Sequence, residues 1–170
     1  MKRSTNVLSD TLRTHVKGVL VRNPEWEPDL AGYSLESSWM IGDWDGVRST
    51  VDTTKSTSPQ VVMAELLLAF QSQDISAIPD ALHKARFILG SPIASSGTRG
   101  YRTTHEAVLD LHLVHELELI HNVVKQTDSK NRISIAELSL ALDSRLHSTL
   151  PTFRNRERIL SMRRTAFEIA

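Results

Sequence analysis

The chain has 170 residues, 40% of them apolar, and its 20 basic side chains balance its 20 acidic ones. Because the net charge is zero, strong non-specific binding to nucleic acid or to an anionic membrane is not expected, and the absence of cysteine fits a reducing, intracellular compartment. The longest strongly apolar run, residues 66–70, is far shorter than the ~20 residues of a membrane helix, so no membrane-spanning segment is expected.

The N-terminal part of the chain is predicted to be a helix followed by a short connector. Apolar residues recur at helical spacing within residues 5–22, including Leu8 and Leu12. Pro24 ends this helix, because the residue before a proline disfavours the helical conformation. The connector that follows carries Trp26.

The sequence around Gly42 predicts a corner between two helices. Gly42 can adopt the left-handed conformation that ends the first helix, and Asp43 can cap the start of the second. Trp39 before the corner and Trp44 after it are expected in the core. Such corners are the units of helical-repeat proteins, in which one helix pair cannot bury its apolar face alone. These four residues are therefore predicted structural positions.

Two helices and a loop are predicted next. Ser58-Pro59 begins a helix whose dense apolar residues, up to Phe70, indicate burial on more than one side. The following helix has Pro79 in its first turn, where the missing N–H costs little. Gly90 with Pro92 is expected to end it. Residues 90–100, rich in serine and glycine, are predicted to be a mobile loop.

Three helices are predicted after this loop. A capping box of Thr103 and Glu106 begins the longest one, to about residue 125, and Ser134 begins the next in the same way. The last covers residues 155–170. Apolar stripes on these helices indicate neighbours on more than one side. In the longest helix the stripes are Leu109, Leu113, Leu117, Ile120 and Val124, and Val108, Leu111, Val114 and Val123; in the next helix the stripe is Ile135, Leu138, Leu142 and Leu146.

No run of alternating apolar and polar residues predicts a strand. The expected fold class is therefore all-α, a tetratricopeptide-like helical repeat, or α-solenoid, of about seven to eight helices. Residues 1–170 are expected to form a single segment of this kind.

His112, His115 and His121 on the longest helix are the candidate metal ligands. Their order with Glu116 and Glu118 fits neither zinc-protease pattern, and a di-iron bundle needs Glu-x-x-His on two helices. Polar residues at the edge of an apolar helix explain the pattern more simply. No metal or other cofactor is expected, and a helical metalloenzyme is the least favoured alternative.

Two other charged groups have structural explanations. Asp43 and Asp45 lack the spacing of a calcium loop, whereas capping and the helix dipole account for two aspartates at a helix start. Five arginines in and just before the last helix are interpreted as a basic surface that is either solvated or faces a partner protein, and direct nucleic-acid binding is disfavoured. They are Arg154, Arg156, Arg158, Arg163 and Arg164.

The chain also lacks the sequence signatures of common catalytic sites. Residues 90–100 contain neither Gly-Lys-Ser/Thr nor Gly-x-Gly-x-x-Gly. Kinase His-Arg-Asp and Asp-Phe-Gly triplets and a Gly-x-Ser-x-Gly elbow do not occur either. The sequence thus predicts no enzymatic activity for this segment.

Three blocks in order resemble the FAT region of phosphatidylinositol 3-kinase-related protein kinases. They are ESSWMIGDWD at 36–45, LHLVHELE at 111–118, and Leu150-Pro151 followed by RERILSMRR at 156–164. The resemblance covers about residues 16–167. It is greatest to the ATR type, the DNA-damage and replication-stress checkpoint kinases, in a fungal-looking form.

This resemblance implies a solenoid that cradles a kinase domain, contributes to dimer contacts and transmits activation signals. It implies no catalytic residue here, because the family's ATP and metal ligands lie in a kinase domain beyond this chain. The implied role is a scaffold within a much larger nuclear kinase. The implied partners are the kinase domain, adjacent repeats, and a homodimer or a regulatory subunit. The alternative is a free-standing tetratricopeptide-like adaptor that binds a peptide in its groove.

Overall fold

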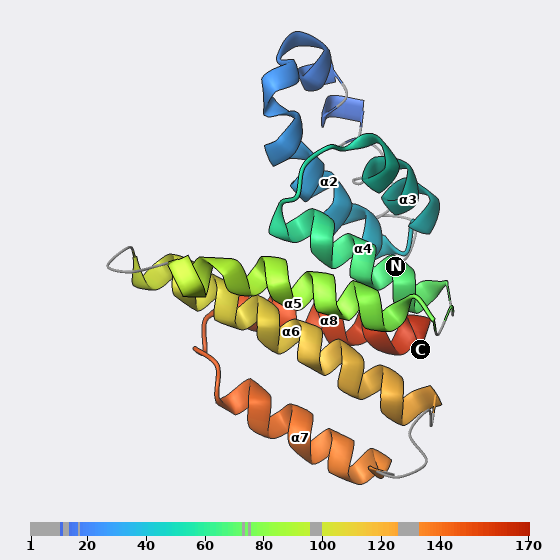
Figure 1. Cartoon of the computed structure of the whole chain (residues 1–170), viewed down its shortest axis with the longest axis vertical. Helices are drawn as coiled ribbons and strands as arrows, with labels where there is room; N and C mark the ends of the chain where they lie inside the picture. Colours follow the sequence, from blue (N-terminus) through green and yellow to red (C-terminus); the bar gives the residue numbers. More distant parts are fainter. Residues whose placement is uncertain are drawn as a thin grey trace. The chain divides into compact units, whose positions relative to one another are not determined.

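The computed structural model describes residues 11, 14–16, 18–72, 74, 76–95, 100–125 and 133–170. Every regular element within these residues is a helix (Figure 1), so the predicted all-α class is confirmed. Within the same residues, no helix is long and apolar enough to cross a membrane. The chain divides into two compact units, Met1–Ala69 and Phe70–Ala170, which are described separately.

The first unit contains the predicted corner. Residues 14–16 and 18–22 are helical, and Val16 is buried; Leu8 and Leu12 of the predicted first helix lie outside the described residues. The corner helices α2 and α3 pack against each other. The elements of this unit are η1 (Pro24–Trp26), α2 (Glu27–Ile41), α3 (Trp44–Thr53) and most of α4 (Pro59–Gln71).

Helix α4 begins and is buried as its sequence predicts. Pro59 is its first residue, and the Ser58 hydroxyl accepts a hydrogen bond from the Val61 N–H at 3.4 Å. Its burial extends around the helix, because four consecutive residues, 61–64, are all buried. A methyl group added at Gly32 of α2 would lie 3.3 Å from the Gln60 side chain, so the glycine leaves room for this side chain of α4.

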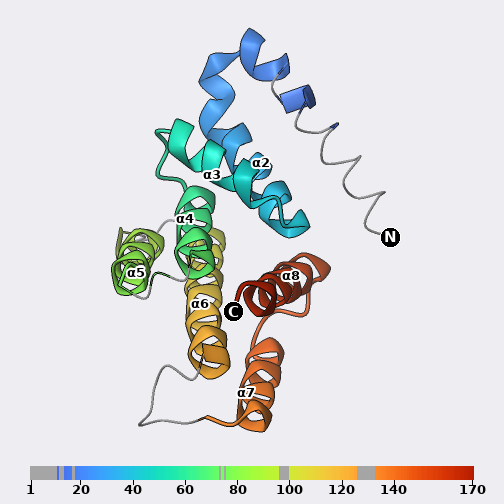
Figure 2. The same ribbon diagram turned by 90° about the vertical axis from the view of Figure 1, so that its right-hand side faces the viewer.

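The second unit is organised around α6. Helix α5 lies along one side of α6, and α7 and α8 lie on its other side (Figure 2). Helices α6 and α8 run in the same direction, and α7 connects them (Figure 1). The bounds are α5 (Ile78–Ser95), α6 (Tyr101–Lys125), α7 (Ile135–His147) and α8 (Phe153–Ile169).

Helix α5 is longer than predicted. Its predicted face is buried at Ile78, Leu82, Ala85 and Leu89, but the helix continues through Pro92 to Ser95. The prediction of a loop at 90–100 is therefore wrong for 90–95, and residues 96–99 lie outside the described part. A methyl group added at Gly90 would lie 3.9 Å from Leu111 of α6. We attribute the continuation to packing on α6, which can override local propensity.

Helix α6 begins at Tyr101, so Thr103 lies inside the helix and does not cap it as predicted. The first predicted stripe is buried from Leu109 to Ile120, but Val124 is exposed. In the second stripe Val114 is buried and Val108 is exposed. Neighbouring helices therefore cover the middle of α6 better than its two ends.

The last two helices have well-formed N-terminal caps. The predicted capping box of Ser134 and Glu137 is present in both directions, which confirms the start of α7. Thr152 caps α8 by accepting from the Asn155 N–H at 3.2 Å. On α7 only Leu138 and Leu142 are buried. The expectation that Ile135 lies on the buried face is wrong, because the neighbouring helices leave its side chain 80% exposed.

Candidate functional site

The corner in the first unit is closed by hydrogen bonds of the backbone. Gly42 has φ 79°, the left-handed conformation, and its N–H donates to Trp39 O at 3.2 Å. The Asp43 N–H donates to Ser38 O at 2.9 Å, which completes a Schellman-type end for α2. The Asp43 carboxylate accepts from the Gly46 N–H at 3.1 Å and so caps α3.

The three tryptophans near the corner differ in burial. Trp39 is only 5% exposed and belongs to the core. Trp44 is half-buried: as the first residue of α3, it is covered less completely than Val47 one turn later. Trp26 is 50% exposed. The tryptophans therefore do not form one aromatic pocket.

The carboxylates at the corner do not converge either. Asp43 caps α3, whereas Asp45 is exposed. Among the described residues, no three histidine, aspartate or glutamate side chains are close enough together to hold a metal ion. The geometry of the corner thus supports a structural role.

A series of ion pairs connects α6 to α8 in the second unit. Arg154 lies 3.9 Å from Glu106, and Arg158 lies 2.6 Å from Asp110. One step further along both helices, Arg163 forms two hydrogen bonds to Glu116, at 2.8 and 2.9 Å. The acidic residues of α6 and their arginine partners occur in the same order along both helices, which fits the parallel directions of α6 and α8.

The Arg163 pair also holds α7. The guanidinium of Arg163 donates to Leu142 O of α7 at 2.6 Å. Arg145 of α7 approaches Glu116 at 3.5 Å and donates to His112 Nδ1 at 2.9 Å. Because Glu116 is buried and both arginines reach it, this cluster joins three helices at one point. We call Glu116, Arg163, Arg145 and His112 the α6–α7–α8 cluster.

The predicted basic surface is therefore smaller than expected. The prediction is wrong for Arg158 and Arg163, because both point toward acidic residues of α6; the Arg163 side chain is only 11% exposed. The other three arginines, Arg154, Arg156 and Arg164, are exposed. Whether these three face a partner stays a prediction.

The three histidines of α6 occupy three different environments. His112 belongs to the cluster, and His115 lies 3.8 Å from Glu118, which also pairs with Arg86 of α5. His121 is buried with its ring 4.8 Å from that of Phe70. Burial, and then the Lys125 charge, lower the pKa of His121. Burial is also the main reason that the pKa of His112 is lowered, and the Arg145 charge adds to it.

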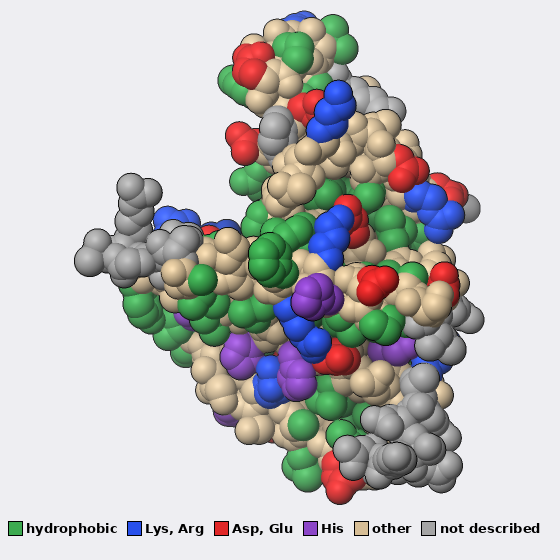
Figure 3. Space-filling view, viewed as in Figure 1, with side chains coloured by type: hydrophobic (Ala, Val, Ile, Leu, Met, Phe, Trp, Pro, Cys, Tyr) green, Lys and Arg blue, Asp and Glu red, His purple; other side chains and the backbone are tan. Residues whose placement is uncertain are grey.

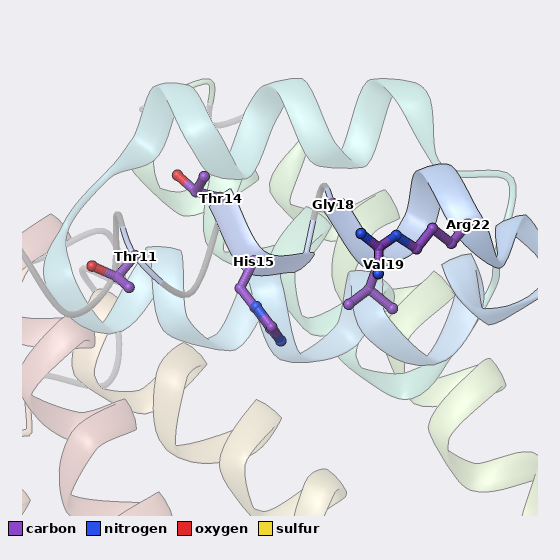
Figure 4. A pocket seen from close by; sticks show the side chains of 6 residues that line it. All are labelled: Thr11, Thr14, His15, Gly18, Val19 and Arg22. Atoms are coloured by element: carbon purple, nitrogen blue, oxygen red, sulfur yellow. The ribbon is translucent and has the colours of Figure 1, made fainter.

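Two of the concave regions that the described residues form lie in different units. The first, about 570 Å³, lies beside residues 11–22. Thr14 and His15 point in opposite directions there (Figure 4), so their polar groups do not converge on one ligand position.

The second is a groove of about 950 Å³ beside α7. Its lining is mainly apolar, and its polar side chains include Arg163, which is already paired within the cluster. Such a lining suits an apolar protein surface better than a polar substrate. The apolar residues are Val123, Val124, Ile133, Ile135, Leu138, Leu140, Leu142 and Phe167.

The visible surface over α5 and α6 carries mixed charges. Basic, acidic and histidine side chains alternate there without a broad patch of one sign (Figure 3). This distribution differs from the continuous basic stripe that is typical of nucleic-acid-binding proteins.

The spacing of charged residues in the sequence indicates the α6–α8 pairs, although the motifs considered above did not include it. Glu106 and Asp110 are four residues apart on α6, and their partners Arg154 and Arg158 are four residues apart on α8. Matched acidic and basic spacings indicate that two helices can pair side by side, and the observed pairs show that these two run in parallel. The contribution of Arg145 could not be predicted, since it depends on the position of α7.

The comparisons with known proteins agree on one family. The FAT domain model matches residues 31–170. Serine/threonine-protein kinase ATR of Arabidopsis thaliana is 25% identical over an alignment of 174 residues, and this alignment covers 92% of this chain and 6% of that protein. The proteins of the same name from Oryza sativa subsp. indica and subsp. japonica are each 21% identical over 172 residues, with the same coverage. No solved structure gives a significant match. The chain thus spans about 6% of the length of these curated relatives.

Proposed function

Because this chain belongs to the FAT domain family, we propose that it is a non-catalytic helical scaffold segment of an ATR-like serine/threonine protein kinase of the DNA-damage and replication checkpoint. The observation that carries the proposal is the coverage: the similarity to ATR kinases extends over 92% of this chain but only 6% of the kinases. A segment with this coverage corresponds to one region of a much larger protein.

The contacts of the described residues support a scaffold role. Several polar side chains of α6 that could serve chemistry are used in pairs between helices, as in Arg163 with Glu116 and Arg145 with His112. Such pairs fix the relative positions of helices. A FAT domain is a non-catalytic region, so we assign no reaction to this segment.

The proposed partners follow from the same family membership. They are the kinase domain and the adjacent helical repeats of the parent chain, with a homodimer or a regulatory subunit as further partners. Both units are proposed to belong to one FAT-type segment, because the family match extends across them. The proposed location is the nucleus, where a checkpoint kinase meets damaged DNA.

The first experiment measures the size of the native polypeptide. An antibody raised against residues 134–170 is used to immunoblot an extract of the source cells. We expect a band far above the 19.1 kDa of this chain. A single band near 19.1 kDa would contradict the proposal that the segment belongs to a large kinase.

The second experiment tests the scaffold role itself. Trp39→Ala in the native gene should reduce checkpoint phosphorylation after replication stress, because it unfolds the corner of the segment, whereas Trp26→Ala at an exposed position should not. The same antibody reports the amount of each protein. Normal phosphorylation in the Trp39→Ala strain, at normal protein levels, would argue against a role for the corner.

The apolar groove beside α7 favours a second candidate, a free-standing adaptor that binds a peptide. This candidate requires the 19.1 kDa band as the native form. The immunoblot therefore separates the two proposals without any assumption about the groove.

A further inference from the structure

The groove beside α7 results from the position of α7 in the second unit. Helices α7 and α8 lie on the same side of α6 (Figure 2). Among the described residues, α7 packs on α6 and has no comparable packing with α8, although the hydrogen bond from Arg163 to Leu142 O joins the two helices at one point. The groove of about 950 Å³ is lined by residues of all three helices.

The apolar lining of this groove is accessible from outside. Ile135 and Leu140 of α7 and Phe167 of α8 line the groove, and each is half or more exposed. Leu138 and Leu142 form its buried part. Exposed apolar side chains that gather in one concave region are typical of protein-interaction sites.

The groove also carries one charge that is not neutralised. Among the described residues that line it, Arg163 and Asp143 are the charged ones. Glu116 neutralises Arg163 through two hydrogen bonds, at 2.8 and 2.9 Å. The Asp143 side chain is 70% exposed, and His147, which lies 3.8 Å from it, is charged only when it is protonated. The described lining is therefore negative when His147 is neutral.

We propose that this groove binds an amphipathic helix of a partner protein, with apolar residues on one face and a lysine or arginine beside them. The apolar face of the partner covers Ile135, Leu140 and Phe167. The basic residue of the partner pairs with Asp143.

The surroundings of the groove favour a helix as the occupant. An extended peptide needs a sheet edge for its backbone N–H and C=O groups, and every regular element among the described residues is a helix. A helix satisfies its own backbone hydrogen bonds. Ile135 and Asp143 are eight residues apart, or ~12 Å along α7, which a partner helix covers in about two turns.

Charge complementarity selects among amphipathic helices. A partner helix with glutamate at the same place would put two carboxylates side by side in a partly desolvated contact, which weakens binding. A purely apolar helix would displace water from Asp143 without giving it a partner. A basic amphipathic helix satisfies both the apolar walls and the carboxylate.

Binding of such a helix goes beyond the proposed function, because a kinase segment and a free-standing adaptor can both present this groove. The size of the native polypeptide, which tests the proposed function, does not depend on what the groove binds. A failure of one proposal is therefore distinguishable from a failure of the other.

Fluorescence anisotropy with the purified 170-residue chain tests the proposal at neutral pH. The probes are two labelled synthetic helices of about five turns, or ~18 residues. Both have leucine along one face, and the remaining positions are lysine in one peptide and glutamate in the other. The lysine peptide should bind at least about tenfold more tightly than the glutamate peptide. Asp143→Lys should reverse this preference, because it reverses the free charge of the groove.

Matched variants separate the groove from a general effect of charge or apolar surface. Asp52→Lys, at an exposed position of α3, should leave the preference for the lysine peptide unchanged. Ile135→Asn should weaken binding of the lysine peptide about tenfold, whereas Phe87→Asn at an exposed position of α5 should not. Circular dichroism should show equal helix content in all four variants, since each replaced side chain is exposed.

Two results would overturn the proposal. The first is a lysine peptide that does not bind, or that binds no better than the glutamate peptide, because the groove then has another occupant. The second is binding that neither Asp143→Lys nor Ile135→Asn weakens, because the contact then lies elsewhere on the chain.

Discussion

At the scale of single residues, the backbone conformation at Gly42 limits which amino acid can occupy this position. Its φ of 79° lies in the left-handed region, and a methyl group added there would meet no atom within 4 Å. Any cost of a substitution is therefore conformational and not steric. Gly18 offers the matched control, since it is helical and equally free of contacts.

Gly42→Ala should destabilise the first unit by about 1–2 kcal/mol, the cost of an L-residue in the left-handed conformation. Gly18→Ala should instead stabilise it by about 0.5–1 kcal/mol, because alanine is the better helix former. Urea unfolding followed by tryptophan fluorescence measures both, since all three tryptophans lie in the first unit. Equal and small effects of the two substitutions would refute the left-handed corner.

Trp39 tests the packing on the inner side of the same corner. Trp39→Ala should lower the free energy of unfolding of the first unit by about 3–5 kcal/mol, because it removes a large buried side chain. Trp26→Ala, at a half-exposed position, should have a much smaller effect. Urea unfolding followed by circular dichroism gives both values. A melting temperature that Trp39→Ala leaves unchanged would mean that the indole is not in the core.

At the scale of helices, the α6–α7–α8 cluster accounts for how α7 is held. Only Leu138 and Leu142 of α7 are buried, which is a small apolar contact for a helix of 13 residues. Arg163 and Arg145 add polar contacts from both sides. We therefore expect α7 to be the first helix of the second unit to open when a member of the cluster is removed.

Arg163→Met should destabilise the second unit by about 3–5 kcal/mol, because Glu116 would be left buried without its main partner. Arg102→Met, which removes an exposed pair with Glu106, should cost no more than about 1 kcal/mol. Hydrogen exchange of α7 peptides together with thermal unfolding measures both. Unchanged protection of α7 in the Arg163→Met variant would contradict the role assigned to the cluster.

His112 gives the cluster a pH dependence. Burial, and then Arg145, hold its pKa below the ordinary value of 6.5; His115 acts in the same direction and Glu116 opposes it. The folded chain therefore favours neutral His112. The stabilising contribution of neutral His112 is present above pH 6.5. It is lost as the pH falls through the lower pKa of the folded state, because the unfolded chain then binds a proton more readily than the folded chain. Buried His121 shifts stability in the same direction.

We therefore expect the urea midpoint of the second unit to fall between pH 7 and pH 5. His112→Gln, which keeps a hydrogen-bond acceptor for Arg145 but does not titrate, should reduce the fall. His83→Gln at an exposed position of α5 should leave it unchanged. A steeper fall of the urea midpoint in the His112→Gln variant would contradict the expected direction of the His112 effect.

At the scale of the whole molecule, charge balance limits the possible partners. The net charge is zero, and the arginines of α8 are divided between inward pairs and an exposed flank. We expect no measurable binding to duplex DNA at physiological salt, because counterion release needs a cluster of basic contacts. Fluorescence anisotropy with a labelled duplex measures this. Binding that weakens steeply with added salt would contradict the expectation.

The sequence by itself determined the features that depend on a few neighbouring residues. Gly42 ends a helix, Ser134 and Glu137 start one, and Ser58 precedes another, because caps and left-handed turns are local properties of the backbone. Strong periodicity also predicted the buried face of α5. The all-α class and the family resemblance rest on the same kind of local pattern.

Only the tertiary structure decided what each helix face contacts. Pro92 lies within α5, Ile135 is exposed, and the Arg163 side chain is only 11% exposed, each against its local pattern. The physical reason is the same in all three cases. Burial and pairing depend on neighbouring helices that are distant in sequence, and their packing free energy exceeds the local preference of one residue.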